Sequence, residues 1–160
     1  MIFLKFYKPK DFEDLNYNLS ELQMEFTATL NLVLERIKER ELNSDFFSQP
    51  ISIFLDEKPV GFFVLDLGED KFGLTENPDS ILVRSFSVNP KFQGEGIGKS
   101  AMFLITDFVK NNFPKVNEII LSVNERNELA YQIYLKTGFH FFGKIISGKS
   151  GLQKILCKKI

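Results

Sequence analysis

The chain has 160 residues, a formal net charge of −1 at pH 7, one cysteine and one histidine. This length fits one domain over residues 1–160, and the balanced charge gives no reason to expect nucleic-acid binding. One cysteine excludes an internal disulfide, and the sequence lacks a metal-ligand cluster, a signal segment and an apolar run of roughly 20 residues, so we expect a metal-free cytoplasmic protein without a membrane partner.

Hydrophobic periodicity changes several times in the first half of the chain. Ser20 and Gln23 form a capping-box pattern ahead of apolar residues at helical spacing, which indicates a long helix. A hairpin follows, because two apolar runs flank a short turn that contains Pro59. We expect, in chain order, a strand at 2–8, a short helix at 11–18, a helix of about 20 residues from Ser20 to near Asn43, and strands at 51–56 and 60–67. Residues 68–80 are predicted to form a polar loop or a disordered hairpin tip.

The second half begins with a strand-like run at 81–88, and an amphipathic helix starts near Gly96 after a glycine-rich segment. This helix should end before Pro114, because the residue before a proline avoids helical geometry. The elements expected after it are a strand at 118–123, a helix at 125–136 with Gly138 as its C-cap, and strands at 139–147 and 152–159.

The glycine-rich join between strand and helix is the most informative segment. Such a join exposes backbone N–H groups and a helix N-terminus, and both favour negatively charged oxygen. A Walker A loop is excluded because Gln93 stands at its first glycine position, and a dinucleotide fingerprint is excluded because Lys99 stands at its last. The remaining pattern is Gln-x-x-Gly-x-Gly from Gln93 to Gly98, which predicts a phosphate-bearing ligand.

A second pattern follows downstream, Asn127-x-x-Ala130-x-x-x-Tyr134-x-x-x-Gly138-Phe139. The two patterns, in this order and separated by one helix and one strand, resemble the GCN5-related N-acetyltransferase (GNAT) family across about half of the chain. The resemblance implies a mixed α/β (α+β) GNAT fold, with a central, mostly antiparallel twisted sheet of about seven strands flanked by about four helices. It also implies acetyl-CoA as the co-substrate, with no metal.

The family's chemistry carries over to named positions. Backbone amides of the loop would bind the coenzyme's pyrophosphate, and a bulge in the strand at 81–88 would free a backbone amide for the thioester carbonyl, as an oxyanion site. Tyr134 is implied as the general acid for the departing thiolate, because a phenol with a pKa of about 10 is protonated at neutral pH. The implied coenzyme-binding residues are Phe86, Ser87 and Val88 in the strand, Gln93, Gly94, Gly96, Gly98 and Lys99 in the loop, and Asn127 for the pantetheine amides.

The acceptor and its general base stay open at this point. An alkylamine with a pKa of about 10.4 is almost fully protonated near pH 7, so a base has to remove its proton. The sequence does not choose among His140, Glu25, Glu76 and Asp79. Acidic residues between 56 and 79 favour a cationic acceptor.

The functional hypothesis is an enzyme that transfers the acetyl group of acetyl-CoA to a primary amine by direct attack in a ternary complex. The expected partner is a small-molecule amine acceptor, such as a polyamine or an amino sugar. A protein or peptide amino group is the alternative, and a non-catalytic acyl-CoA-binding regulatory domain is a second one. The strict identity of the acyl group and the formation of a homodimer are left open.

Overall fold

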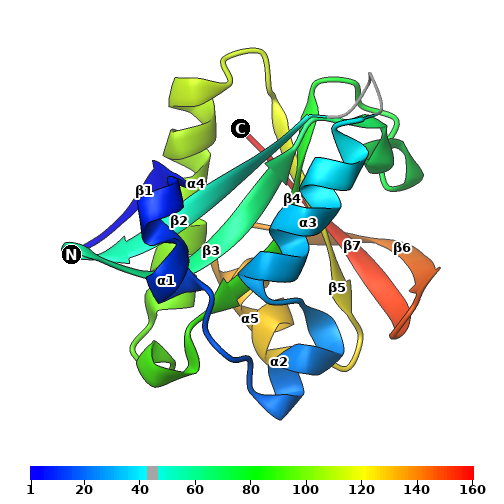
Figure 1. Ribbon diagram of the computed structural model, residues 1–160. Helices are drawn as coiled ribbons and strands as arrows, with labels where there is room; N and C mark the ends of the chain where they lie inside the picture. The colour runs from blue at the N-terminus through cyan, green and yellow to red at the C-terminus, as the bar shows by residue number, and fades with distance from the viewer. Residues whose placement is uncertain (43–46) are drawn as a thin grey trace.

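One seven-stranded sheet organises the molecule (Figure 1). The computed structural model describes residues 1–42 and 47–160. The strand order is β1-β2-β3-β4-β5-β7-β6, and neighbouring strands are antiparallel except for β4 and β5. The strands are β1 Ile2–Phe6, β2 Ser48–Leu55, β3 Lys58–Asp66, β4 Ser80–Val88, β5 Glu118–Asn124, β6 His140–Gly148 and β7 Gly151–Lys159. The predicted mixed fold with a mostly antiparallel sheet is confirmed.

Helices cover both faces of this sheet. They are α1 Phe12–Leu15, α2 Glu21–Phe26, α3 Leu30–Arg40, α4 Ile97–Asn112 and α5 Glu128–Lys136, with 3₁₀ turns η1 Pro9–Asp11, η2 Glu69–Gly73 and η3 Pro90–Phe92. In Figure 1, α1 and α3 cross in front of the sheet and α4 runs behind it. Successive residues of a strand point to opposite faces, so Phe62 packs with Leu30 of α3 while Phe63 joins the core with Ile105 of α4. Within the described parts of the chain, no helix is long and apolar enough to cross a membrane.

The long helix expected after Ser20 is two helices, α2 and α3. The predicted capping box of Ser20 and Gln23 does begin α2, but Thr27 ends it with extended backbone angles of φ −146° and ψ −179°. A β-branched residue loses rotamer freedom in a helix, which favours a break here. The expected helix end near Asn43 lies outside the described residues.

Residues 68–80, expected to be a polar loop or a disordered tip, fold against the beginning of β4. Lys71 is buried there, with 4% of its surface exposed. Its ammonium donates to the carbonyl oxygens of Pro78 at 2.7 Å and Ser80 at 2.9 Å, and its burial lowers its pKa. These bonds fasten η2 to the sheet, so the segment is ordered around a buried cation.

Candidate active site

The loop that precedes α4 holds two glycines in the left-handed region. Gly94 has φ +83°, and Gly96, the N-cap of α4, has φ +77°. A Cβ at either position would meet nothing within 4 Å, so the backbone angle rather than crowding favours glycine there. At Gly98 a Cβ would lie 3.6 Å from the ring of Phe86. Because Gly96 has no side chain to cap α4, the first N–H groups of this helix are available to an anion.

Gln93 fixes the loop to the end of β4. Its Nε2 donates to the carbonyl oxygen of Val88 at 3.2 Å, which attaches the loop to the strand. Lys99 is exposed in the first turn of α4, with its ammonium 5.9 Å from the centre of the Phe103 ring. The loop therefore combines a fixed backbone with one exposed cation.

β4 has a bulge at Ser85. In its pairing with β3, Phe62 faces Ser87 and Val64 faces Arg84, so one residue of β3 lies opposite two residues of β4. Ser85 has φ +58°, an angle that is strained for a residue other than glycine. The bulge implied by the resemblance is present. Ser85 itself was missed, because a serine in a strand carries no local signal of a left-handed angle.

β4 and β5 separate toward their C-terminal ends. Their parallel pairing consists of three residue pairs at the beginning of both strands, and the last pair is Leu82 with Ile120. Both strands continue beyond it, to Val88 and Asn124. Separated strands present backbone donors and acceptors along their facing edges. The opening between them can therefore hold an extended ligand that carries amide groups.

Tyr134 projects from α5 into the core beside this opening. It is 7% exposed, and its ring lies 6.5 Å from that of Phe86 and 5.9 Å from that of Phe139. Burial raises the pKa of Tyr134 well above the ordinary value of a phenol, because an apolar environment disfavours the phenolate. Phe86 directly follows the bulged residue, so a protonated phenol lies one aromatic ring away from the bulge.

Asn127 is the N-cap of α5. Its Oδ1 accepts a hydrogen bond from the N–H of Ala130 at 3.3 Å. This cap sets the beginning of the helix at Glu128, so the predicted beginning at residue 125 was wrong by three residues. The cap uses one lone pair of the side-chain oxygen, and the amide nitrogen of the same side chain can donate to a ligand.

Tyr17 and Gln23 contact β4 from the side of the sheet that α1 and α3 cover. Neither was predicted as a site residue. Tyr17 Oη lies 2.6 Å from Ser87 Oγ, and burial raises the pKa of Tyr17 well above its usual range. Gln23 Nε2 donates to the carbonyl oxygen of Val88 at 2.8 Å. The capping-box pattern placed Gln23 on a helix, but no local signal predicts a bond to a strand so distant in the sequence.

The candidates for a general base do not lie in one place, and of the four it is Glu25 of α2 that lies beside the end of β5. At about 3.3 Å per strand residue, Asp79 is roughly 20 Å from Ser85, and Glu76 precedes Asp79. His140 is exposed on the edge strand β6, and Glu25 of α2 is already in an ion pair. Among residues 1–42 and 47–160, no group of three or more His, Cys, Asp or Glu side chains could hold a metal ion.

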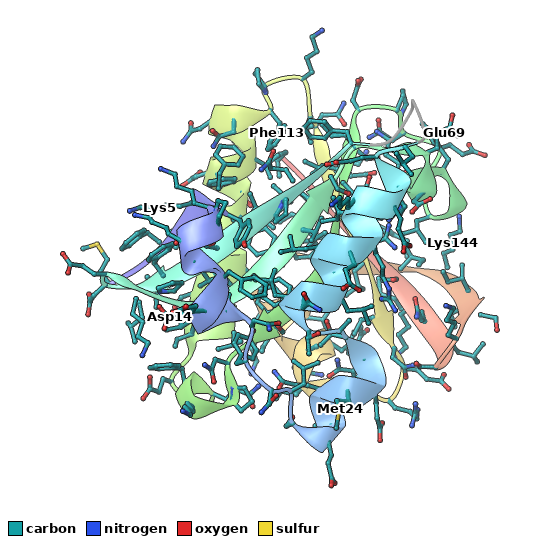
Figure 2. All side chains as sticks on the ribbon, viewed as in Figure 1. Lys5, Asp14, Met24, Glu69, Phe113 and Lys144 are labelled. Atoms are coloured by element: carbon teal, nitrogen blue, oxygen red, sulfur yellow. The ribbon has the colours of Figure 1, made fainter. Side chains whose placement is uncertain are left out.

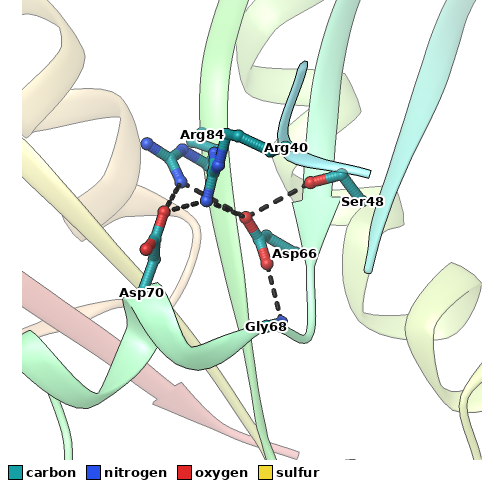
Figure 3. A network of polar contacts seen from close by, with 6 residues as sticks. All are labelled: Arg40, Ser48, Asp66, Gly68, Asp70 and Arg84. Atoms are coloured by element: carbon teal, nitrogen blue, oxygen red, sulfur yellow. Dashed lines mark hydrogen bonds and ion pairs between the residues drawn. The ribbon is translucent and has the colours of Figure 1, made fainter. Parts of the chain in front are cut away.

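Several acidic residues between 56 and 79 are paired within the molecule. The buried carboxylate of Asp66 lies 3.2 Å from Arg84 and 3.6 Å from Arg40, and Asp70 contacts the same two arginines (Figure 3). The carboxylate of Asp56 lies 2.7 Å from the amino terminus. These pairs neutralise carboxylates that had suggested a cationic acceptor, so the acidic segment supports that interpretation less than the sequence indicated.

Comparison with known proteins agrees with this geometry. The profile of the acetyltransferase (GNAT) family matches residues 15–139. The chain is similar to the uncharacterized N-acetyltransferase YbbJ of Bacillus subtilis (strain 168), with 35% identity over 160 residues, or 97% of this chain and 95% of that protein. It is also similar to the spermine/spermidine N(1)-acetyltransferase of that strain, with 25% identity over 131 residues, or 82% of each protein.

Solved acetyltransferase structures share the fold. Aminoglycoside acetyltransferase AAC(6')-Ib, in complex with coenzyme A and kanamycin, has a TM-score of 0.77 at 20% identity, covering 99% of this chain and 95% of that one. Spermidine N-acetyltransferase from Vibrio cholerae, in complex with CoA and spermine, has a TM-score of 0.70 at 16% identity, covering 99% and 95%. The profile match and the 35% identity over nearly the full length show that the chain belongs to the acetyltransferase (GNAT) family.

Proposed function

We propose that this protein transfers the acetyl group of acetyl-CoA to a primary amine, by direct attack in a ternary complex. The observation that carries the proposal is the order of three features along one stretch of chain: the bulge at Ser85, the opening beside β4, and the glycine loop before α4. A thioester, a pantetheine arm and a pyrophosphate follow one another in the same order along acetyl-CoA. Membership of the acetyltransferase family supports this chemistry.

In this proposal, coenzyme binding depends mainly on backbone groups. The loop N–H groups and the positive end of the α4 dipole bind the pyrophosphate, and the lysine in the first turn adds a point charge. The assigned residues are Gln93, Gly94, Gly96, Gly98 and Lys99 for the pyrophosphate and its loop, Phe86, Ser87 and Val88 for the arm and the thioester, and Asn127 for the pantetheine amides.

The chemical step is an acyl transfer through a tetrahedral intermediate. The unprotonated amine attacks the thioester carbonyl carbon, a C–N bond forms, and a backbone N–H freed by the bulge stabilises the negative oxygen. The C–S bond then breaks, and Tyr134 donates a proton to the departing sulfur. The nitrogen loses one proton to solvent and the phenolate of Tyr134 regains one from solvent, so the products are an amide and coenzyme A as a thiol.

The buried position of Tyr134 is compatible with this role in spite of its raised pKa. A phenol in water is a weaker acid than a thiol, so its proton transfer to a thiolate is uphill. The apolar surroundings that raise the phenol's pKa also disfavour an anionic sulfur, and they therefore raise the pKa of the leaving thiol as well. The phenol keeps its proton until a thiolate forms beside it.

For the acceptor, we propose a small cationic amine such as a polyamine or an amino sugar. The support comes from relatives, because one is a spermine/spermidine N(1)-acetyltransferase and others were solved with kanamycin or spermine. Asp66 and Asp70 do not favour a cationic acceptor, because arginine side chains within the molecule pair with them. A protein or peptide amino group is the alternative acceptor.

A thiol-release screen tests the proposal. The protein is incubated with acetyl-CoA and with spermidine, spermine, amino sugars, amino acids or lysine-containing peptides, and mass spectrometry checks the acetylated product. We expect release that depends on a small cationic amine. Release with peptides alone would move the assignment to peptide amines. Coenzyme binding without acetylation of any amine would instead indicate an acyl-CoA-binding regulatory domain.

A further inference from the structure

Helix α2 is short and has no buried residue. None of its residues Glu21–Phe26 is buried, and the apolar side chains of Leu22 and Met24 are 59% and 61% exposed. Figure 2 labels Met24 on α2, at the lower edge of the molecule. Burial of apolar area therefore contributes little to the placement of this helix. Specific side-chain contacts have to hold it against the sheet.

The first contact attaches α2 to the end of β4. Gln23 uses both ends of its side-chain amide, because Oε1 accepts from the N–H of Ser20 at 2.9 Å and Nε2 donates to the carbonyl oxygen of Val88 at 2.8 Å. The capping interaction with Ser20 thus orients the amide so that its NH₂ group reaches β4. This attachment lies at the residue where the bulged strand ends.

The second contact attaches α2 to the turn after β5. The carboxylate of Glu25 lies 3.4 Å from the guanidinium of Arg126, which also lies 5.7 Å from the centre of the Phe26 ring. Arg126 in turn donates to the carbonyl oxygen of Ser150 at 3.0 Å. α2 therefore bridges the ends of the two strands that separate to form the opening.

The carbonyl oxygen of Val88 is shared between α2 and the coenzyme loop. It accepts one hydrogen bond from Gln23 at 2.8 Å and another from Gln93 at 3.2 Å, which its two lone pairs allow. Both bonds depend on where this one carbonyl oxygen lies, so the positions of the two glutamine side chains are not independent. A change in the position of Gln93 alters the acceptor that Gln23 uses.

We propose that Gln23 is a positioning residue that couples coenzyme binding to the placement of α2 over the opening, through the carbonyl of Val88. The inference rests on the proposed function, because it requires the coenzyme at the loop. A bound pyrophosphate fixes Gln93, which in turn fixes the Val88 carbonyl and with it Gln23 and α2. Coupling of this kind is reciprocal, so the α2 contact also strengthens coenzyme binding. The acceptor then meets a completed site only in the loaded enzyme.

Hydrogen–deuterium exchange on the full chain, with and without saturating coenzyme A, tests the coupling. In the wild type, coenzyme A should slow exchange in the loop 93–100 and also in α2. Gln23→Glu keeps the capping-box acceptor, which glutamate also supplies, but its carboxylate cannot donate to Val88. In this variant coenzyme A should protect the loop alone. The Kd of coenzyme A should rise by about fivefold, near the lower end of usual coupling factors.

Two further variants separate charge from hydrogen bonding. Gln23→Met removes the donor without adding a charge, and it should also lose protection of α2. Gln132→Glu adds the same charge on the exposed side of α5, where Gln132 bonds Glu128 within its own helix at 2.8 Å, and it should behave like the wild type.

The outcomes that overturn each claim differ. Protection of the loop without protection of α2 in the wild type would overturn the coupling and leave the coenzyme site intact. If coenzyme A still protects α2 in both Gln23 variants, the coupling through Gln23 is overturned and the coenzyme site is again left intact. If coenzyme A protects neither segment of the wild type, the proposed function itself fails.

Discussion

Ser85 has a left-handed backbone angle inside a strand, at the position where the proposed oxyanion site requires an irregular backbone. Glycine adopts φ +58° without a steric penalty, so Ser85→Gly should keep or slightly raise the free energy of unfolding. Ser85→Val should lower it by about 1–2 kcal/mol, because a Cβ substituent clashes in the left-handed region. Urea denaturation measures both changes. Ser122→Val in β5, a described position without a positive φ, is the control. If Ser85→Val and Ser122→Val lower the free energy of unfolding equally, the backbone of Ser85 is not specially strained.

Tyr134→Phe removes one hydroxyl and keeps the ring between Phe86 and Phe139. If the phenol is the general acid, turnover with an acceptor from the screen should fall by about 100-fold while the Kd of acetyl-CoA changes little. Stopped-flow thiol release and calorimetry measure the two quantities. Tyr131→Phe is the matched control, because Tyr131 lies on the same helix and its ring faces the ammonium of Lys154 at 4.4 Å. Wild-type turnover in Tyr134→Phe would leave this residue with a packing role.

The pH dependence of turnover follows from the burial of Tyr134. Burial raises the pKa of this phenol, so loss of the acid by ionisation moves to higher pH than for an exposed tyrosine. Turnover should rise with pH as the acceptor amine loses its proton, and it should not fall again below about pH 10, the ordinary phenol pKa. A pH–rate profile checks this expectation. A fall near or below pH 10 that disappears in Tyr134→Phe would show a phenol that titrates as if it were exposed.

Helices and strands whose signals are local could be predicted from the sequence. The hairpin of β2 and β3 and the helix α4 follow from apolar periodicity and turn residues. The break between α2 and α3 could not be predicted, because Leu22, Phe26 and Leu30 keep helical spacing across it. The ordered conformation of residues 68–80 could not be predicted from the sequence either. Lys71 is a buried cation only because the fold brings two carbonyl oxygens to its ammonium.

The charged network of Figure 3 joins β3, β4 and α3 through one buried carboxylate. Asp66→Ala should lower the free energy of unfolding by about 1–3 kcal/mol, because it leaves the N–H of Gly68 and the hydroxyl of Ser48 without this acceptor and removes one of the two carboxylates that pair with Arg84. The loss is smaller than for a fully buried pair, since the side chains of Arg40 and Arg84 are 30% and 38% exposed. Urea denaturation measures the change. Asp70→Ala should lower the free energy of unfolding by under about 1 kcal/mol, because Asp70 is half exposed. A larger loss for Asp70→Ala than for Asp66→Ala would contradict this expectation.

For the molecule as a whole, the two sides of the site differ in how much the sequence reveals. The segments proposed to bind the coenzyme stand out in the sequence, because the loop before α4 and the cap of α5 are contiguous segments with recognisable residues. The other side does not, because its bonds join residues that are 70 positions apart for Tyr17 and Ser87 and 65 apart for Gln23 and Val88. These bonds exist only after the topology lays the first helices over β4.

Coenzyme A and acetyl-CoA should both raise the Tm of the intact protein. A ligand that binds only the folded chain stabilises it by about 2.7 kcal/mol at 100 times its Kd. For a chain of this size, 1 kcal/mol corresponds to about 2–4 °C, so a shift of about 5–10 °C is expected. Scanning calorimetry measures it, with adenosine as a control that lacks the pyrophosphate. An unmoved Tm with both coenzymes would exclude the proposed function.

The same measurement places the ligand on the loop. Gly96→Asp puts a carboxylate at the N-terminus of α4, where the pyrophosphate has to bind, and should abolish the shift through like-charge repulsion. Gly96→Asn has the same shape and tolerates the left-handed angle without a charge, so part of the shift should remain. Both variants should fold, because Asn and Asp tolerate the left-handed angle better than other residues and a Cβ at this exposed position meets nothing within 4 Å. Gly73→Asp, at another open position, controls for the added charge. A wild-type shift in Gly96→Asp would place the coenzyme away from the loop.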